Sequence, residues 1–308
     1  MMTDQKSYYR SFSSYLKELF GQSVYRISID AGFTCPNRNG TIEAFGCAYC
    51  SPRGSWNDGL GRLSIDEQVA QQKELIRRRY KAHKFLAYFQ AYTNTYAPVK
   101  KLKAIYDSVV QGDDDFVGII IGTRPDCIDR EKLDLISTYT EKGLKVWIEY
   151  GLQSARERTL KLIERGHGTK VFQDAVLLTH GYGIGVGTHV IIGLPDETET
   201  DVHYTADFLA DLPVDLVKIH NLNIVENTKM AEWYRSGKVA PLSLDDYANL
   251  VVEFLERTAP EVAVARLVAE SKKTSLIEPR WSLNKPRAIH RIVTCFKERQ
   301  SYQGKLYR

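Results

Sequence analysis

Three cysteines stand close together near the start of the chain, in the pattern C-x(11)-C-x(2)-C formed by Cys35, Cys47 and Cys50. A structural zinc site commonly has four ligands in two close pairs, so zinc would need a distant fourth ligand such as His167, His180 or His220. An iron–sulfur cluster usually takes four thiolates. With three, one iron would stay open to bind a substrate or cofactor, as an open catalytic zinc site does.

The residues between the cysteines favour a loop wrapped around a bound group. Pro36, Asn37, Asn39 and Gly40 are turn formers, and Gly46 lets the backbone come close beside Cys47. Tyr49 either lays its ring against a planar ligand or is a packing tyrosine. The two remaining cysteines, Cys127 and Cys295, stand alone and are interpreted as small buried side chains. They are too few for a second cluster.

The overall composition is that of a soluble globular protein. The chain has 308 residues, of which 43% are hydrophobic and 26% charged. Its first residues, MMTDQKSYYRSFSSYLKELF, lack the apolar stretch of a signal peptide, and no apolar run approaches the ~20 residues of a membrane span. We therefore expect a cytoplasmic protein without a membrane partner. Its thiols would stay reduced, which disfavours a disulfide interpretation.

Positive charge is unevenly distributed along the chain. The formal net charge is +4, but residues 261–308 hold most of the basic excess, and a second basic run, RRRYKAHK, spans residues 77–84. Either segment could contact a phosphate backbone, although a charge run is more often a solvated helix face. Charge alone does not decide between a nucleic-acid surface and an ordinary one.

Strand-like and helix-like segments alternate along most of the chain. Strands are expected at 24–30, 85–91, 117–122, 144–150, 187–193 and 215–222, each followed by helical sequence, which indicates a parallel α/β fold. The strand order cannot be read from the sequence, so an open doubly wound sheet and a barrel both fit. The favoured prediction is a partial TIM-type (β/α)6 barrel with a C-terminal α/β extension. Its parts are a lead-in (1–23), a core barrel (24–260) and a basic extension (261–308).

Polar residues and glycines follow the ends of these strands. In parallel α/β folds the site lies at the carboxyl ends of the strands, so these residues are expected at one rim. They are Cys35; Gln90, Tyr92, Thr93 and Asn94; Thr123, Arg124 and Asp126; Glu149, Gln153 and Ser154; Gly193 and Pro195; and His220 and Asn221.

Several segments together resemble a known superfamily. Three cysteines ending in C-x-aromatic-C, on the loop after the first strand, resemble the radical S-adenosylmethionine (SAM) superfamily. GTRPDCI (122–128), IEYGLQS (148–154) and VIIGLPDET (190–198) are similar to segments of the branch that contains the elongator catalytic subunit. Further segments, among them YFQAYTNTYAP, RGH, KIHNLNIVENT and EPRWSLNKPRAIHRI, resemble one bacterial family of small radical SAM proteins.

The resemblance implies a cofactor pair and roles for individual residues. Cys35, Cys47 and Cys50 would hold one [4Fe-4S] cluster, whose open iron would chelate SAM, and Tyr49 would lie near the adenine. The usual G-G-E segment after the second strand is replaced here by QAYTNT, so the methionine amine would contact Gln90, Tyr92 or Thr93 instead. Glu149 and Gln153 are candidates for ribose or methionine contacts and Arg124 for the carboxylate, unless Arg124 pairs with Asp126. Ser154 and Gly193 complete the predicted cofactor site.

The resemblance also implies a substrate and a partner. It predicts action on tRNA, converting a carboxymethylaminomethyl group on the wobble uridine to aminomethyl, with an external electron donor of flavodoxin or ferredoxin type. The two basic segments are compatible with an anticodon stem-loop lying over the barrel mouth. Candidate substrate residues are Lys218, His220, Lys285, Arg287 and His290. Two alternatives remain: a radical enzyme for a small metabolite or protein, and a metal-binding or electron-transfer protein that never cleaves SAM.

Overall fold

A single curled sheet of seven parallel strands organises the chain. The computed structural model describes residues 7–51 and 63–308. The strand order is β1-β2-β3-β4-β5-β6-β8, and each neighbouring pair is parallel. The strands of this sheet are β1 (Val24–Ile29), β2 (Lys84–Phe89), β3 (Phe116–Thr123), β4 (Lys145–Gln153), β5 (Gly185–Ile192), β6 (Leu216–Asn221) and β8 (Ala263–Arg266). A short antiparallel pair, β7 (Ile224–Val225) with β9 (Leu276–Glu278), lies beside it.

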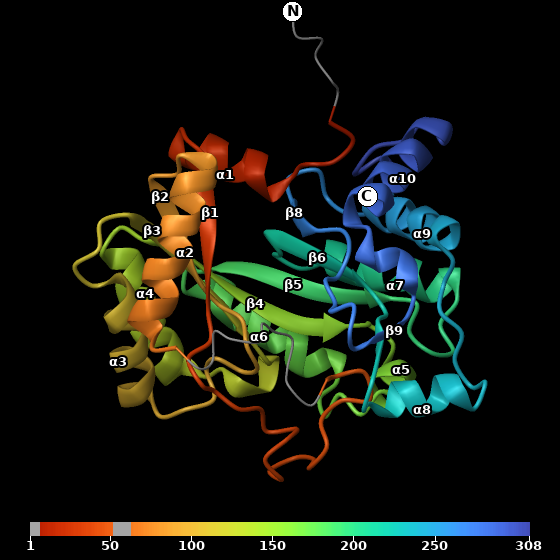
Figure 1. Ribbon diagram of the computed structural model, residues 1–308, viewed down its shortest axis with the longest axis horizontal. Helices are drawn as coiled ribbons and strands as arrows, with labels where there is room; N and C mark the ends of the chain where they lie inside the picture. The colour runs from red at the N-terminus through yellow and green to blue at the C-terminus, as the bar shows by residue number, and fades with distance from the viewer. Residues whose placement is uncertain (1–6, 52–62) are drawn as a thin grey trace, which may run out of the picture.

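Helices connect the strands and cover the outer face of the sheet (Figure 1). They are α1 (Phe12–Phe20), α2 (Ile65–Tyr80), α3 (Val99–Val110), α4 (Arg130–Glu141), α5 (Glu157–Leu162), α6 (Thr169–Gly181), α7 (Glu199–Ala210), α8 (Lys229–Arg235), α9 (Leu244–Glu256) and α10 (Lys285–Glu298), with short 3-10 turns at Pro125–Cys127 and Arg280–Leu283. No described helix is long and apolar enough to cross a membrane. The sheet is a half-barrel, which confirms the predicted partial TIM-type fold.

The two faces of the sheet bury different kinds of side chain. Residues such as Ile27, Ile119 and Ile148 belong to the large apolar core that includes Leu102 of α3 and Leu133 of α4. Strand neighbours alternate between faces. The intervening residues, among them Tyr88, Glu149 and Lys218, therefore line the inner face of the half-barrel.

Helix α1 packs at the N-terminal end of this inner face. Phe12 and Leu16 of α1 form a small apolar cluster with Trp147 and Leu216, and α1 contacts both edge strands, β1 and β8. A backbone bridge joins Ser11 to Val264 of β8. The segment predicted only as a lead-in thus contains a helix that closes one end of the half-barrel.

Two other segments differ from what the sequence pattern suggested. The strand expected within residues 261–308 is β8, which pairs with β6 as the seventh strand of the main sheet. The basic run at 77–84 lies at the wrong end for a contact at the barrel mouth. In the parallel register, Lys84 pairs with Val24, the first residue of β1, whereas the cysteine loop follows the last.

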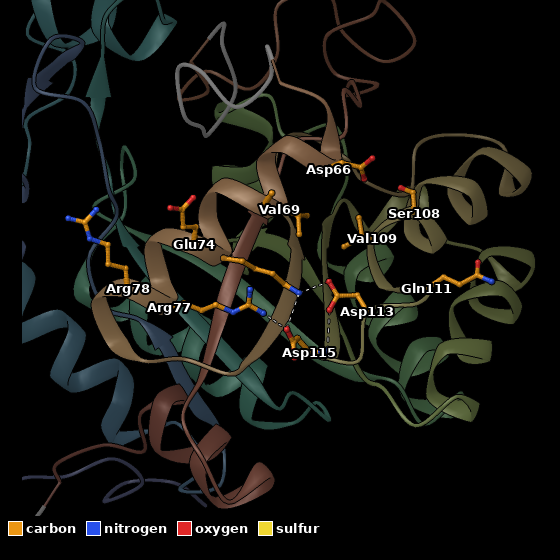
Figure 2. A pocket seen from close by; sticks show the side chains of 12 residues that line it. Asp66, Val69, Glu74, Arg77, Arg78, Ser108, Val109, Gln111, Asp113 and Asp115 are labelled. Carbon is orange, nitrogen blue, oxygen red and sulfur yellow. Dashed lines mark hydrogen bonds and ion pairs between the residues drawn. The ribbon is translucent and has the colours of Figure 1, made fainter.

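Part of this basic run is also neutralised by neighbouring acids. Figure 2 shows Arg77 of α2 pointing toward Asp115, while Arg78 points away. The Lys73–Asp113 and Arg77–Asp115 ion pairs line a surface pocket between α2 and α3. Helix α2 runs antiparallel to the strands, so its C-terminal basic residues return to the N-terminal edge of the sheet.

Candidate functional site

The cysteine loop lies at the carboxyl edge of the half-barrel and is fixed by backbone hydrogen bonds. Two of its turns form within the loop, from Arg38 N to Cys35 O (2.8 Å) and from Cys50 N to Cys47 O (2.9 Å). Ala48 joins the loop to its surroundings: its N–H donates to Ile163 O at 3.0 Å, and its carbonyl accepts from Met230 N at 2.9 Å. The cysteines are therefore held between the end of α5 and the start of α8.

The thiol of Cys47 is surrounded by hydrogen-bond donors. Asn37 Nδ2 lies 3.3 Å from Cys47 Sγ, and the Arg165 guanidinium lies 3.7 Å away. Asn37 also donates to Glu164 O at 2.8 Å, and Arg165 donates to Gly151 O at 2.7 Å. Both side chains are therefore placed to donate hydrogen bonds to a metal-bound sulfur at Cys47.

The three thiols are spaced too widely for a single ion. Two thiolates on one zinc ion can be at most about 4.6 Å apart, twice the usual zinc–sulfur distance. In the described part of the chain, the only group of three or more His, Cys, Asp or Glu residues whose ligand atoms all lie within 4.8 Å of one another is Glu199, His203 and Glu253. The three sulfurs thus do not meet the condition for sharing one zinc ion. All three cysteines are free, as a multi-iron cluster requires.

The loop after β2, which replaces the usual G-G-E segment, packs directly on the cysteine loop. Thr93 N donates to Thr34 O at 3.2 Å, so the two loops are joined next to Cys35. Tyr92 adopts a left-handed backbone (φ 60°), and its ring lies 6.0 Å from the Arg38 guanidinium carbon. Gln90 is half-buried. The structure brings Thr93 and Tyr92 to the cysteine loop, and the contacts of all three residues with SAM stay a prediction.

Arg124 forms an ion pair with Asp126, which is the alternative interpretation given for it in the sequence. Its guanidinium donates to both carboxylate oxygens of Asp126, at 2.9 and 2.7 Å, and to Arg165 O at 3.0 Å. Only 3% of the side chain is exposed. Arg124 therefore fixes the segment that carries Arg165, and through it the surroundings of Cys47. Its predicted contact with the SAM carboxylate is untested.

The predicted residues at the end of β4 differ in their surroundings. Gln153 has a left-handed backbone (φ 76°) beside Gly151, where a Cβ atom would lie only 2.4 Å from Gln153 Nε2. Ser154 Oγ donates to Glu197 Oε1 at 2.5 Å and accepts from Arg156 N at 3.0 Å. Ser154 thereby ties β4 to the loop after β5. That loop begins at Gly193, whose φ of 94° suits glycine alone.

Glu149 and Lys218 form a buried polar network on the inner face of the sheet. Lys218 Nζ lies 2.5 Å from Glu149 Oε2 and donates to Tyr88 Oη at 2.7 Å. His189 Nε2 lies 2.9 Å from the same carboxylate oxygen, and the rings of His189 and His220 are 5.3 Å apart. Both charged side chains of the pair are 1% exposed. The network joins a residue predicted for the cofactor to one predicted for the substrate.

Burial and pairing shift the protonation of this network. Although burial raises the pKa of Glu149, the neighbouring Lys218 and His189 hold it well below its usual range. Burial lowers the pKa of Lys218, and Glu149 partly offsets that effect. Burial also lowers the pKa of His189 and His220, so both histidines are neutral at pH 7. Glu149 Oε1 and His220 Nε2 are buried without a hydrogen-bond partner in the described structure.

The remaining candidate substrate residues lie on or near α10. Lys285 forms an ion pair with Glu270 at 2.6 Å. Arg287 and His290 are exposed on α10. The five candidates therefore separate into two residues on β6, the buried Lys218 and the half-buried His220, and three residues on the C-terminal helix.

Several residues of the site were not anticipated from the sequence. Arg165 contacts Cys47, whereas Tyr88 and His189 complete the network around Glu149. Arg26 and Arg266 are likewise polar residues in otherwise apolar strands. These residues could have been found in the sequence as polar side chains inside apolar strands, at the alternate positions that face away from the helix-covered side of the sheet.

Comparison with known proteins identifies the family. The radical SAM superfamily model matches residues 40–209, and the radical SAM C-terminal domain model matches residues 214–298. The chain is 39% identical over 301 residues to the uncharacterized protein YtqA of Bacillus subtilis, covering 97% of this chain and 92% of that one.

More distant similarity extends to two further proteins. A tRNA uridine(34) acetyltransferase of Dehalococcoides mccartyi is 27% identical over 157 residues, which cover 50% of this chain and 33% of that one. The solved structure of archaeal Methanocaldococcus infernus Elp3 with an N-terminal deletion has a TM-score of 0.67 at 16% identity, covering 91% of this chain and 64% of that one. The Elp3 similarity shows a shared fold. Together with the family models and YtqA, these comparisons show that the chain belongs to the radical SAM superfamily, whose members use a [4Fe-4S] cluster and S-adenosylmethionine.

Proposed function

We propose that this protein is a tRNA-modifying radical SAM enzyme. It would act on the wobble uridine and convert its carboxymethylaminomethyl group to aminomethyl. The observation that carries the enzymatic part is the position of three free cysteines at the carboxyl edge of the half-barrel, next to buried polar side chains on its inner face.

In this proposal Cys35, Cys47 and Cys50 hold the [4Fe-4S] cluster. When bound, the cluster and SAM would supply the radical chemistry needed to remove a hydrogen atom from the substrate. Asn37 and Arg165 stabilise the sulfur of Cys47 by hydrogen bonds. The rim residues Gln90, Tyr92, Thr93, Arg124, Gln153 and Ser154 and the turn at Gly193 surround SAM, and Tyr49 contacts its adenine. An external donor of flavodoxin or ferredoxin type provides the electron.

In this proposal, Glu149 and Lys218 of the inner-face network position a bound group. Glu149 Oε1 is buried and lacks a hydrogen-bond partner in the described structure, so it is available to accept from a bound hydroxyl or amine. Lys218 fixes the other carboxylate oxygen and prevents the side chain from rotating freely. Helix α1 closes the N-terminal end of this face, and the side chains of Glu149 and Lys218 are only 1% exposed, so little water reaches this part of the half-barrel and a reactive intermediate would be protected from side reactions.

The tRNA part of the proposal is supported by similarity and by the resemblance of motifs. The acetyltransferase that matches half of this chain is named for uridine 34 of tRNA. Arg287 and His290 are exposed on α10 and are available to contact phosphate. Because Arg77 is paired at the opposite edge of the sheet, the C-terminal helix carries the proposed anticodon contacts.

The test is mass spectrometry of tRNA nucleosides from a strain that lacks the gene. We expect aminomethyl-type uridine to disappear and carboxymethylaminomethyl-uridine to accumulate. Complementation with the wild-type gene should restore the profile, and complementation with Cys47→Ala should not. An unchanged nucleoside profile would refute the tRNA assignment.

A second measurement separates the enzymatic proposal from a non-catalytic one. The protein is reconstituted with iron and sulfide without oxygen, then incubated with SAM and dithionite. Formation of 5′-deoxyadenosine is expected. Its absence from a protein with a full cluster would favour a metal-binding or electron-transfer role. Formation together with an unchanged tRNA profile would point to a metabolite or protein substrate.

A further inference from the structure

The inner face of the half-barrel carries more positive than negative charge. Arg26 on β1, Lys218 on β6 and Arg266 on β8 lie on it, and Lys218 is paired with Glu149. At the rim, Lys285 is paired with Glu270. Lys218 and Lys285 thus each have a carboxylate partner, whereas no ion pair of Arg26 or Arg266 is present among the described residues, and their charges act on Glu270 only in addition to that of Lys285.

The guanidinium of Arg26 lies near two aromatic rings and forms no ion pair within residues 7–51 and 63–308. The guanidinium carbon lies 5.8 Å from the ring centre of Phe12 and 5.7 Å from that of Tyr88. One terminal nitrogen is buried without a hydrogen-bond partner in the described part of the protein. Leaving such a group unpaired costs about 1–3 kcal/mol, and more for a charged group. A bound acceptor would remove this cost.

Arg266 approaches the same region from the other edge of the sheet. It is half-buried, and its register partner on β6 is Lys218. No ion pair of Arg266 is present among residues 7–51 and 63–308. The positive charges of Arg26 and Arg266 both contribute to lowering the pKa of Lys218, after burial and against the effect of Glu149. The strands β1 and β8 are opposite edges of the sheet. Because the sheet curls, the positive charges of both arginines nevertheless act on the same residue, Lys218.

Neutral groups complete the surroundings of the two arginines. Tyr88 accepts a hydrogen bond from Lys218, and burial raises its pKa well above the usual value, so it is uncharged. His189 and His220 are neutral at pH 7 as described above. Two half-buried guanidinium groups without ion-pair partners in the described structure attract an anion, because charge interactions are less screened there than in open solvent.

We propose that Arg26 and Arg266 bind the carboxylate of the substrate side chain. This inference rests on the proposed function, in which the group removed from the uridine is a carboxymethyl group. Guanidinium groups match a planar carboxylate geometrically and bind it by charge-assisted hydrogen bonds. The arginines would hold the group that leaves, and they would select the acid over neutral side chains at the same uridine position.

The experiment compares two anticodon stem-loops that differ in one group. One has carboxymethylaminomethyl-uridine at the wobble position, and the other has the corresponding carboxamide. Dissociation constants are measured by fluorescence anisotropy with the reconstituted holoenzyme and SAM, and kcat/KM is measured by nucleoside mass spectrometry. Charged hydrogen bonds contribute about 1.5–3 kcal/mol, so we expect the wild type to prefer the acid by about 10- to 150-fold.

The variants Arg26→Gln and Arg266→Gln should each reduce this preference by about tenfold or more, by weakening binding of the acid alone. Arg266→Lys should retain part of the preference because it keeps the charge. Arg78→Gln is the matched control, since this exposed arginine lies at the other end of the sheet and its loss removes the same charge. Its acid-to-amide ratio should equal that of the wild type.

Three results would overturn the inference. The first is a wild type without preference for the acid. The second is a preference that both glutamine variants retain. The third is equal weakening of acid and amide, which would mean that the arginines bind a backbone phosphate. The nucleoside profile of the deletion strain distinguishes these results from failure of the proposed function. If that profile changes as expected while any of the three results is found, the proposed function stands and the assignment of the two arginines is rejected.

Discussion

The ammonium of Lys218 and the carboxylate of Glu149 meet at 2.5 Å on the inner face of the half-barrel, although 69 residues separate them in the chain. The two strands that carry them, β4 and β6, are not neighbours, because β5 lies between them. Gly187 on β5 makes the contact possible, since a Cβ atom there would lie 2.8 Å from Glu149 Cγ. The pair therefore depends on a missing side chain in the intervening strand.

Breaking this pair from one side should destabilise the protein strongly. Lys218→Met leaves a buried carboxylate with only His189 as partner, and removing one member of a buried ion pair commonly costs about 3–5 kcal/mol. Urea unfolding followed by circular dichroism measures the loss. The double variant Lys218→Met/Glu149→Gln should lose less than the two single variants added together. Strict additivity would show that the two side chains are not coupled.

Filling the space at Gly187 should disturb Glu149 directly. Gly187→Ala forces the Glu149 side chain to move, and overpacking of this kind costs about 1–3 kcal/mol. Gly181→Ala is the matched control, because no atom lies within 4 Å of a Cβ added at this last residue of α6. The control should retain the wild-type midpoint of thermal unfolding. Equal midpoints for the two variants would contradict the proposed close contact.

The cysteine loop should lose its cluster without losing its fold when Cys47 is replaced. Cys47→Ala removes one predicted iron ligand, while the backbone hydrogen bonds of Ala48 to Ile163 and Met230 remain. Iron and sulfide content and the iron–sulfur absorbance band should fall to background after anaerobic reconstitution. Cys295→Ala, a buried cysteine on α10, should bind a full cluster. Stoichiometric zinc with no such absorbance in the wild type would refute the cluster assignment.

Stability should decrease in mild acid because of His167. Burial, followed by the charges of Arg165 and Arg124, lowers the pKa of this histidine from 6.5 to about 3. The folded pKa is depressed, so the unfolded chain takes up a proton first as the pH falls. The contribution of neutral, buried His167 to the free energy of unfolding is therefore complete above pH 6.5 and is lost between pH 6.5 and about 3.

The slope of this pH effect can be measured with a matched variant. One proton of difference corresponds to at most about 1.4 kcal/mol per pH unit. The free energy of unfolding of the wild type should fall more steeply than that of His167→Gln on going from neutral to mildly acidic pH. Parallel curves for the two proteins would show that His167 is protonated normally in the fold.

Much of the architecture follows from local sequence patterns. Apolar strands followed by helical sequence predicted the parallel half-barrel, and α2 begins at a local signal of the same kind, the capping box of Ser64 and Glu67. The cysteine spacing and the accompanying motifs also identified the superfamily. These features are readable because they depend on residues that are close together in the chain.

The sequence alone placed the basic run at 77–84 incorrectly. Its charge suggested a contact near the barrel mouth, but charge carries no information on which end of a sheet a helix reaches. The direction of α2 relative to the strands decides that, and it puts Arg77 beside Asp115. The strand at 263–266 was similarly recognisable as a strand, while its place as the seventh member of the main sheet depends on pairing with β6.

The sequence by itself determined the cysteine motif, the βα rhythm and the polar rim. The tertiary structure decided how the inner-face residues combine, because strand order and sheet curl are set by long-range pairing. Glu149 and Lys218 appeared as candidates for two different ligands, and the fold joins them in one ion pair. Arg26 and Arg266 drew no attention in the sequence, and they matter only because the sheet curls until its edge strands face one interior.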